Sequence, residues 1–127
     1  GLGDVYKRQA KNKLPYLIAL SEKKVVGLAY LNKFREKSGY RFAFENTIYI
    51  HDKHTRQGIG YKLLKELLFI SKNLKNIKLI VAVIGSIDSK GSLKLHKKLG
   101  FKKTGVLKKI GFKNNKWIDS IFLQKNL

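Results

Sequence analysis

The chain has 127 residues, of which 43% are hydrophobic, enough to bury the core of one compact domain. It contains no cysteine, which excludes disulfide frameworks, thiolate zinc sites and cysteine nucleophiles, and its three histidines are a thin supply for a metal site. Lysine and arginine number 28 against 8 aspartate and glutamate residues, and the net charge of +20 favours an anionic partner such as nucleic acid, a membrane surface or a phosphorylated cofactor. The lysines are spread along the whole chain, so most of them are expected on a solvated surface.

The sequence predicts a single domain without a membrane partner. No apolar run is long enough to cross a bilayer, and the first residues lack the apolar centre of a secretory signal, so we expect a cytoplasmic protein. Residues 1–9 differ in character from the rest, and we interpret them as a non-native scar. Residues 10–127 then form the domain, with no internal repeat, low-complexity tract or linker.

The first half of the domain predicts three strands followed by a helix. Residues 16–20 and 25–31 are β-rich runs joined by a short polar turn, which predicts an antiparallel hairpin. Residues 41–50 are rich in aromatic and β-branched residues and predict a third strand after a charged loop. From Ile59 to Leu74 the apolar residues recur at three- and four-residue spacing, which indicates an amphipathic helix.

The second half predicts a buried strand, a short helix and a closing hairpin. Residues 77–84 are apolar at nearly every position, which is typical of a central strand covered on both faces. Residues 92–99 predict a short helix that Gly100 ends, and two further strands are joined by a turn at residues 114–115. The predicted order is therefore β-β-β-α-β-α-β-β, an α/β (α+β) fold with a mixed sheet.

The junction between the third strand and the long helix carries two glycines in a basic turn. Glycine is costly inside regular elements, so its use here suggests that the main chain comes close to another group. The unpaired N–H groups at the start of a helix bind phosphates. The junction lacks the Gly-Lys-Ser/Thr of a P-loop and the third glycine of the dinucleotide fingerprint. We interpret it as a loop that could surround a pyrophosphate, formed by Arg56, Gln57, Gly58, Ile59, Gly60 and Tyr61.

The run ENTIYIHDKHTRQGIGYKLLKELL, residues 45–68, resembles motif A of the GNAT acetyltransferases. The runs YRFAFEN, VAVIG and LHKKLGFKKTGVLKKIGFKNNKWIDSIFLQ make the chain similar to the phosphinothricin acetyltransferase-like group, from about Tyr16 to the last residue. The resemblance implies a GNAT-like, mostly antiparallel sheet, a homodimer, and an enzyme that uses acetyl-CoA and no metal. It also implies direct transfer of the acetyl group to the amino group of a small amino acid or analogue. Members of the group begin with a further strand and helices that this sequence lacks, so we expect an N-terminally truncated fragment, which could be inactive as it stands.

Acetyl transfer to an amine needs a base for the proton of the amine and a donor for the departing thiolate. Glu45 lies mid-strand, where a carboxylate is disfavoured and burial would raise its pKa. An outward-facing glutamate paired with a lysine is an equal interpretation of the residue alone, and the resemblance favours the base. His96 stands where related enzymes often carry a tyrosine that donates to the thiolate, although a half-buried structural histidine is the more ordinary interpretation.

The remaining predicted contacts concern the cofactor and the acceptor. The pantetheine arm resembles a peptide, so main-chain groups of Ile48, Tyr49 and Ile50 are expected to pair with it. The resemblance places Ser89 where the group usually has an asparagine that contacts the cofactor. The carboxylate of the acceptor could be bound by Lys37, Tyr40 and Arg41 beside an apolar wall formed by Phe42, with a role as plain surface charge equally open for Lys37.

Three further features remain open. His51 and His54 flank Asp52 in the basic turn, where a metal site would need more ligands than the spacing offers. Trp117 and Asp119 match the closing Trp-x-Asp of the group, and their role is not assigned. The alternative function is a basic nucleic-acid-binding module without catalysis, because residues 33–42 and 111–118 interleave cations with aromatic rings that could stack on bases.

Overall fold

The computed structural model describes residues 4–9, 14–51, 58–87 and 89–127, which form one sheet with helices packed against it. The elements are β1 (Asp4–Gln9), β2 (Pro15–Ser21), β3 (Lys24–Lys33), the 3₁₀ helix η1 (Ser38–Tyr40), β4 (Ala43–Ile50), α1 (Ile59–Lys72), β5 (Leu79–Gly85), α2 (Lys90–Lys98), β6 (Lys102–Lys113) and β7 (Lys116–Asn126). The strand order across the seven-stranded sheet is β1-β2-β3-β4-β5-β7-β6. Neighbouring strands are antiparallel except β4 and β5, which are parallel.

The predicted order of elements is confirmed from β2 to β7, and so is the mixed, mostly antiparallel sheet. The predicted number of strands is wrong by one, because part of the segment that we set aside forms β1. This strand pairs with β2 from Asp4↔Leu20 to Gln9↔Pro15. The edge of β2 presents a row of main-chain donors and acceptors. Any added strand can pair with them, because the pairing uses main-chain groups and does not depend on the origin of the strand's sequence. Whether residues 1–9 are a non-native scar stays a prediction.

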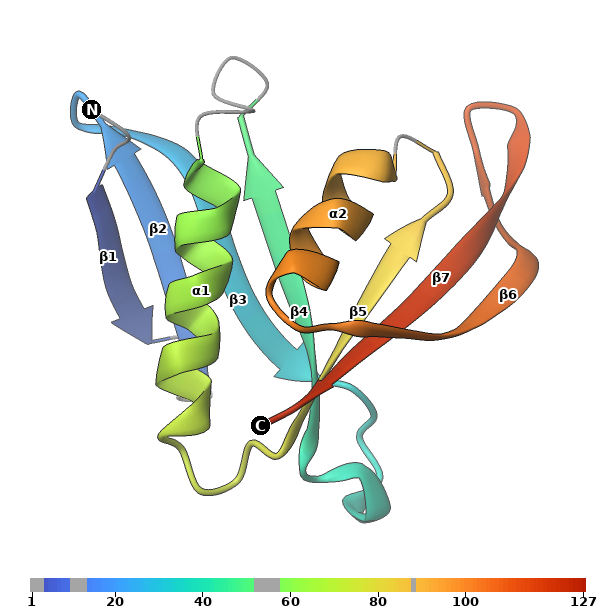
Figure 1. Cartoon of the computed structure of the whole chain (residues 1–127), viewed down its shortest axis with the longest axis horizontal. Helices are drawn as coiled ribbons and strands as arrows, with labels where there is room; N and C mark the ends of the chain where they lie inside the picture. The colour runs from blue at the N-terminus through green and yellow to red at the C-terminus, as the bar shows by residue number, and fades with distance from the viewer. Residues whose placement is uncertain (1–3, 10–13, 52–57, 88) are drawn as a thin grey trace.

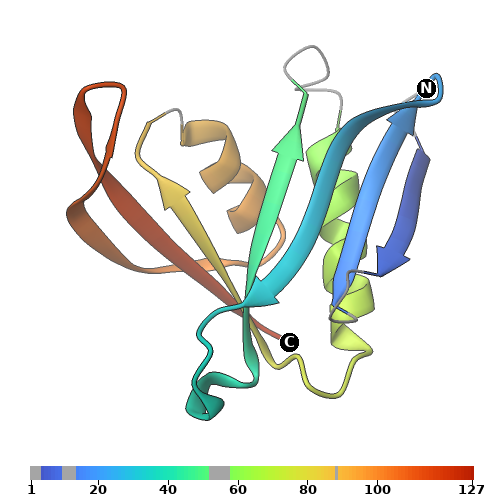
Figure 2. The same cartoon turned by 180° about the vertical axis from the view of Figure 1, so that it is seen from behind.

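Both helices lie on one face of the sheet (Figure 1), and Figure 2 shows the opposite face, on which the described residues place no α-helix. The apolar stripe of α1 faces the sheet as its spacing predicted, with Leu63, Leu64 and Leu67 fully buried. Helix α1 ends at Lys72, two residues before the predicted end at Leu74, whose side chain is 37% exposed. The helix packs on β2, β3 and β4, whereas α2 packs on β5.

The core lies in the single layer between the helices and the sheet. Its fully buried side chains come from every central element, for example Leu17 of β2, Ile80 of β5 and Leu123 of β7. Each such side chain contributes about 1.5–3 kcal/mol of transfer free energy on burial. Strand β5 lies between β4 and β7 and is largely buried, as its apolar run predicted.

The turns agree with the residues that the sequence offers. The tight turn between β6 and β7 places Asn114 and Asn115 at φ values of 52° and 59°, the left-handed region that asparagine tolerates well. Gly100 follows α2 at φ 96°, which only glycine adopts readily, and so ends that helix.

Strands β4 and β5 separate after a short paired stretch. Their parallel pairing runs from Ala43↔Leu79 to Glu45↔Val81, after which β4 continues to Ile50 without β5 as a partner. Strand β5 instead follows β7 to its end at Gly85. The two strands therefore diverge, as Figure 1 shows, and α2 lies over the side of β5 that adjoins the gap. This divergence positions the candidate active site.

Candidate active site

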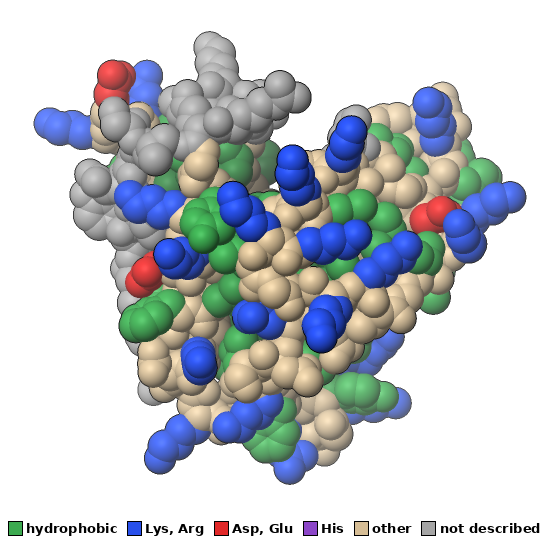
Figure 3. Space-filling view, viewed as in Figure 1, with side chains coloured by type: hydrophobic (Ala, Val, Ile, Leu, Met, Phe, Trp, Pro, Cys, Tyr) green, Lys and Arg blue, Asp and Glu red, His purple; other side chains and the backbone are tan. Residues whose placement is uncertain are grey.

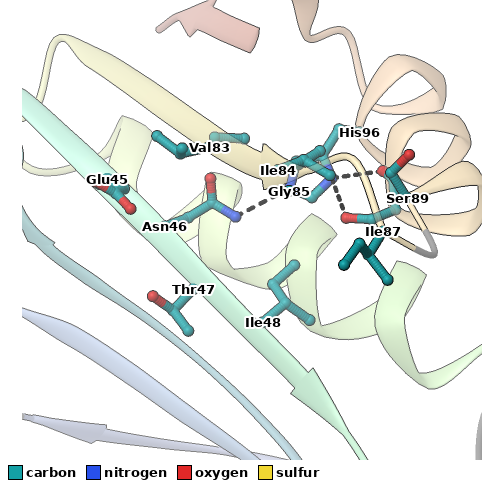
Figure 4. Close-up of a pocket in the computed structure, with 12 residues that line it drawn as sticks. Glu45, Asn46, Thr47, Ile48, Val83, Ile84, Gly85, Ile87, Ser89 and His96 are labelled. Atoms are coloured by element: carbon teal, nitrogen blue, oxygen red, sulfur yellow. Dashed lines mark hydrogen bonds between the residues drawn. The ribbon is translucent and has the colours of Figure 1, made fainter. Parts of the chain in front are cut away.

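A cavity of about 300 Å³ lies where β4 and β5 diverge (Figure 4). Its walls come from β4, the end of β5, the segment that follows β5, and α2. The lining residues are Glu45, Asn46, Thr47, Ile48, Ala82, Val83, Ile84, Gly85, Ile87, Ser89, Ser92 and His96. Four predicted site residues therefore meet in one place: Glu45, Ile48, Ser89 and His96.

Glu45 is the last residue of β4 that pairs with β5. Its neighbours Phe44 and Asn46 are buried towards the helices, so alternation along the strand directs the half-buried Glu45 side chain to the other face of the sheet. Burial raises the pKa of this carboxyl above its usual value. Within the described ranges, no hydrogen bond or ion pair engages the carboxylate. The group is therefore a stronger base than a solvated glutamate and is free to accept a proton.

His96 and Asn46 form a buried polar pair on the helix side of the cavity. The Asn46 Nδ2 lies 3.1 Å from His96 Nε2, and His96 Nδ1 lies 2.7 Å from the main-chain oxygen of Ser92 (Figure 4). A carbonyl can only accept and an amide nitrogen can only donate, so Nδ1–H donates to Ser92 and Nε2 accepts from Asn46. Burial lowers the pKa of His96, more than the hydrogen bond to Ser92 raises it. The imidazole is therefore neutral near pH 7.

This arrangement differs from the predicted acid role of His96. A neutral imidazole carries one N–H, and here that group is directed at Ser92 rather than into the cavity. The ring also packs edge-on against Phe101, with centroids 4.9 Å apart. The geometry instead makes His96 a group that holds the Asn46 amide in place. Among the described residues nothing donates to the buried Oδ1 of Asn46.

Main-chain hydrogen bonds alternate along β4. The N–H of His51, which follows β4, donates to the main-chain oxygen of Val26 at 2.8 Å, whereas the oxygen of Phe42, just before β4, accepts from the N–H of Leu79 at 3.2 Å. Odd-numbered residues of β4 therefore direct their main-chain groups towards β3, and even-numbered residues direct theirs towards β5.

The predicted main-chain contacts divide accordingly. Ile48 and Ile50 present N–H and C=O groups to the gap that β5 has left, as an edge strand does. Tyr49 directs its main-chain groups towards Leu28 in β3, and its side chain is 55% exposed. Two of the three residues thus have the geometry predicted for pairing with a peptide-like ligand, and Tyr49 does not.

Helix α1 starts next to the open end of the gap (Figure 1). Gly58 is the N-cap residue, at φ 77°, and no side chain caps the helix. The first-turn N–H groups of Ile59, Gly60 and Tyr61 precede the first helical hydrogen bond, from Lys62 N–H to Gly58. A Cβ on Gly60 would lie 3.3 Å from Leu95 Cδ2, so this glycine also lets α2 approach α1 closely. The predicted Arg56 and Gln57 lie outside the described residues, as do Asp52 and His54.

The predicted acceptor-binding residues lie elsewhere. Arg41 and Phe42 line a separate cavity of about 590 Å³ at the beginning of β4, where the guanidinium carbon of Arg41 lies 4.5 Å from the centre of the Phe42 ring. Lys37 and Tyr40 are exposed at η1. None of the four lines the Glu45 cavity.

Three polar residues of the cavity were missed in the sequence. Asn46 follows Glu45 in a strand, where asparagine is disfavoured, and this was a usable signal. Ser92 precedes His96 by four residues on α2, the spacing at which helix side chains meet. Thr47 is an ordinary strand residue and gave no signal.

Two further kinds of feature are absent from the described residues. The described residues contain no group of three or more His, Asp or Glu side chains that could hold a metal ion. In the same ranges, no helix has the length and apolarity that spanning a membrane requires.

Comparison with known proteins identifies the family. A family model described as an acetyltransferase (GNAT) domain matches residues 4–122. The chain belongs to the GNAT acetyltransferase family. A crystal structure of a GNAT superfamily phosphinothricin acetyltransferase (Pat) from Sinorhizobium meliloti in complex with AcCoA superposes with a TM-score of 0.85 at 38% identity, covering 91% of this chain and 62% of that chain. The predicted family resemblance and GNAT-like fold are thus confirmed.

Two of the similar proteins are named as acetyltransferases of amino-acid analogues. The phosphinothricin N-acetyltransferase of Alcaligenes faecalis is 38% identical over 114 residues, which are 90% of this chain and 57% of that protein. The L-methionine sulfoximine/L-methionine sulfone acetyltransferase of Salmonella typhimurium is 32% identical over 121 residues, 94% of this chain and 70% of that protein. The chain thus spans less than two thirds of the length of the Alcaligenes protein. The alternative prediction, a nucleic-acid-binding module, finds no support in these comparisons.

Proposed function

We propose that this GNAT domain transfers the acetyl group of acetyl-CoA to the amino group of a small amino acid or amino-acid analogue. The observation that carries the proposal is the half-buried carboxylate of Glu45, which no described residue pairs with, at the point where β4 and β5 diverge. The acceptor class is supported by the relatives, which are named for phosphinothricin and methionine sulfoximine. A homodimer and residence in the cytoplasm stay expectations from the sequence.

The residues present fit acetyl-CoA as the acetyl donor. The gap-facing main-chain groups of Ile48 and Ile50 would pair with the amides of the pantetheine arm, and the buried Oδ1 of Asn46 is an acceptor that lacks a donor among the described residues. The first-turn N–H groups of α1, with Arg56 and Gln57, would hold the pyrophosphate. Ser89 lines the cavity at the N-cap of α2 and makes no side-chain capping bond, so its hydroxyl remains for the arm. Acetyl-CoA supplies the activated acetyl group as a thioester.

Glu45 acts as the general base in this proposal. An amino acid carries an ammonium group at neutral pH, and one proton must leave before the nitrogen can attack the thioester carbonyl. The Glu45 carboxylate takes that proton, directly or through a water, and its raised pKa makes the transfer more favourable. A C–N bond forms and the C–S bond breaks, and the second proton, which the nitrogen loses as the amide forms, goes to the departing thiolate to give free coenzyme A.

His96 is proposed as a positioning residue rather than as the acid. Its neutral ring holds the Asn46 amide on the helix side of the cavity through the 3.1 Å contact of Nε2 with Nδ2. For the acceptor carboxylate we retain Lys37 and Tyr40, with Arg41 and Phe42 beside them, as candidates in the loop before β4. They lie outside the Glu45 cavity, so this assignment requires an acceptor that extends towards η1.

The test is an assay of free thiol released from acetyl-CoA in the presence of single amino acids, phosphinothricin or methionine sulfoximine. We expect Glu45→Gln to lower kcat by about 10²–10⁴-fold and to remove the limb of the pH–rate profile that reports the base. Glu66→Gln is the matched control, because Glu66 is exposed on α1. A Glu45→Gln enzyme with the wild-type rate and pH profile would refute the base assignment.

A further inference from the structure

A tyrosine ring with two lysines lies at the first turn of α1. Tyr61 is the third residue of the helix, and the Nζ of Lys65, one turn further on, lies 5.7 Å from the centre of its ring. The Nζ of Lys98, which belongs to α2, lies 5.0 Å from the same ring centre. Both distances are within the range of cation–π contacts. Two ammonium groups from different helices therefore converge on one aromatic ring.

The packing of α2 on α1 fixes this convergence. Leu95 of α2 approaches Gly60 so closely that a Cβ there would lie 3.3 Å from Leu95 Cδ2. Lys98 follows Leu95 by three residues, so both side chains lie on the side of α2 that faces α1. The close contact between the helices thus brings a cation from α2 next to the start of α1.

In the described part of the chain, neither Lys65 nor Lys98 forms an ion pair with a carboxylate. The ion pairs found there involve Lys33 with Glu36 and Lys108 with Asp119, both away from this cluster. Figure 3 shows lysine and arginine side chains spread over the face that carries α1 and α2, with few acidic side chains among them. Like charges held close together raise the local positive potential, which a bound anion would neutralise.

We propose that Tyr61, Lys65 and Lys98 form a subsite for the phosphate monoester on the ribose of coenzyme A. The inference rests on the proposed function, in which the pyrophosphate is held at the first turn of α1. Tyr61 is three residues beyond the N-cap Gly58, a rise of about 4.5 Å along the helix axis. The ribose phosphate adjoins the pyrophosphate in the coenzyme, and two flexible ammonium groups suit a compact dianion. The lysines then discriminate coenzyme A from carriers that end in an unphosphorylated ribose.

The test compares coenzyme A with 3′-dephospho-coenzyme A by calorimetric titration at low salt. We expect the wild-type chain to bind coenzyme A roughly tenfold more tightly than 3′-dephospho-coenzyme A, because contacts between the lysines and the ribose phosphate are charge-assisted and therefore among the stronger hydrogen bonds. The Lys65→Gln/Lys98→Gln double variant should bind the two ligands within about twofold of each other, with little change for the dephospho ligand. The wild-type preference should also shrink as salt rises, because exposed charges are screened.

Lys72→Gln is the matched control. Lys72 is exposed at the other end of α1, and its replacement removes one positive charge, as each of the two test substitutions does. It should keep the tenfold preference. Equal binding of both ligands by the wild-type chain, or an unchanged preference in the double variant, would overturn the subsite and leave the proposed function standing. Failure of the wild-type chain to bind either ligand would instead overturn the proposed function on which the subsite rests.

Discussion

The Asn46–His96 pair provides a sharp test of the site. Replacing both residues should destabilise the chain less than the sum of the two single replacements predicts. Asn46→Leu leaves the buried Nε2 of His96 without its donor, and His96→Leu leaves the Asn46 amide without its acceptor. A buried polar group that loses its partner costs about 1–3 kcal/mol. In the double variant both polar groups are gone and two apolar side chains of similar size face each other, which is often close to neutral.

The double-mutant cycle isolates this coupling. The contact of the His96 ring with Phe101 is lost in both variants that lack His96, so it cancels from the interaction energy. We expect the double variant to be at least about 1 kcal/mol more stable than the sum of the single effects predicts. Urea denaturation of the four proteins, followed by circular dichroism, measures the free energies of unfolding. A coupling within about 0.3 kcal/mol of zero would refute the hydrogen bond on which the assignment of the neutral tautomer depends.

The same variants carry a pH signature with a definite sign. Burial lowers the pKa of His96 in the folded chain below its usual value of 6.5. At pH values between the folded-state pKa and 6.5, the unfolded chain therefore binds more protons than the folded chain. The contribution of neutral His96 to the free energy of unfolding is thus fully present above pH 6.5. It is lost as the pH falls from 6.5 towards the folded-state pKa. His96→Leu should flatten this part of the stability profile, whereas a profile identical to that of the wild type would contradict the burial of a neutral imidazole.

Two further substitutions test the framework around the site. Gly27→Ala should lower the free energy of unfolding, measured by urea denaturation, by about 1–3 kcal/mol. The added Cβ would lie 2.9 Å from Ile50 Cδ1 and 3.1 Å from the Tyr49 main-chain oxygen. A variant as stable as the wild type would contradict this crowding. Asp119→Ala should speed hydrogen exchange of the Lys109 amide, which donates to Asp119 Oδ1 at 2.8 Å. An unchanged exchange rate at Lys109 would show that this hydrogen bond does not protect the amide. That hydrogen bond also lowers the pKa of Asp119, so in the wild type the protection should weaken only as the pH falls below 3.8.

Local patterns predicted most of the fold because the relevant physics is local. The three- and four-residue spacing of apolar residues in α1 and the apolar run of β5 report directly which side chains are buried. Leu74 continues the helical spacing but lies beyond the helix, which ends at Lys72. Strand β1 was missed for a different reason. We excluded its segment on composition, whereas its pairing depends on the edge that β2 offers.

The candidate site was predicted only in part, because it depends on contacts between distant segments. Glu45 was found from its position within a strand, since a carboxylate there is unusual. The link between Asn46 and His96 joins residues 50 positions apart, and no local pattern encodes it. Arg41 and Phe42 are close to Glu45 in sequence but line another cavity, because they precede β4 and therefore lie before the point at which β4 and β5 diverge.

The separation of β4 from β5 links the fold to the chemistry. Strand β5 follows β7 with continuous pairing from Leu79↔Asn126 to Gly85↔Ser120, and this pairing carries its end away from β4. Main-chain groups such as those that Ile48 and Ile50 direct into the gap are unfavourable if they are buried without a partner. A ligand with amide groups along an extended arm can satisfy them, whereas the stacked bases and charged backbone of a nucleic acid offer no such row of donors and acceptors. Among the anionic partners that the net charge allowed, the sheet geometry thus favours a phosphorylated cofactor with a peptide-like arm over a nucleic acid.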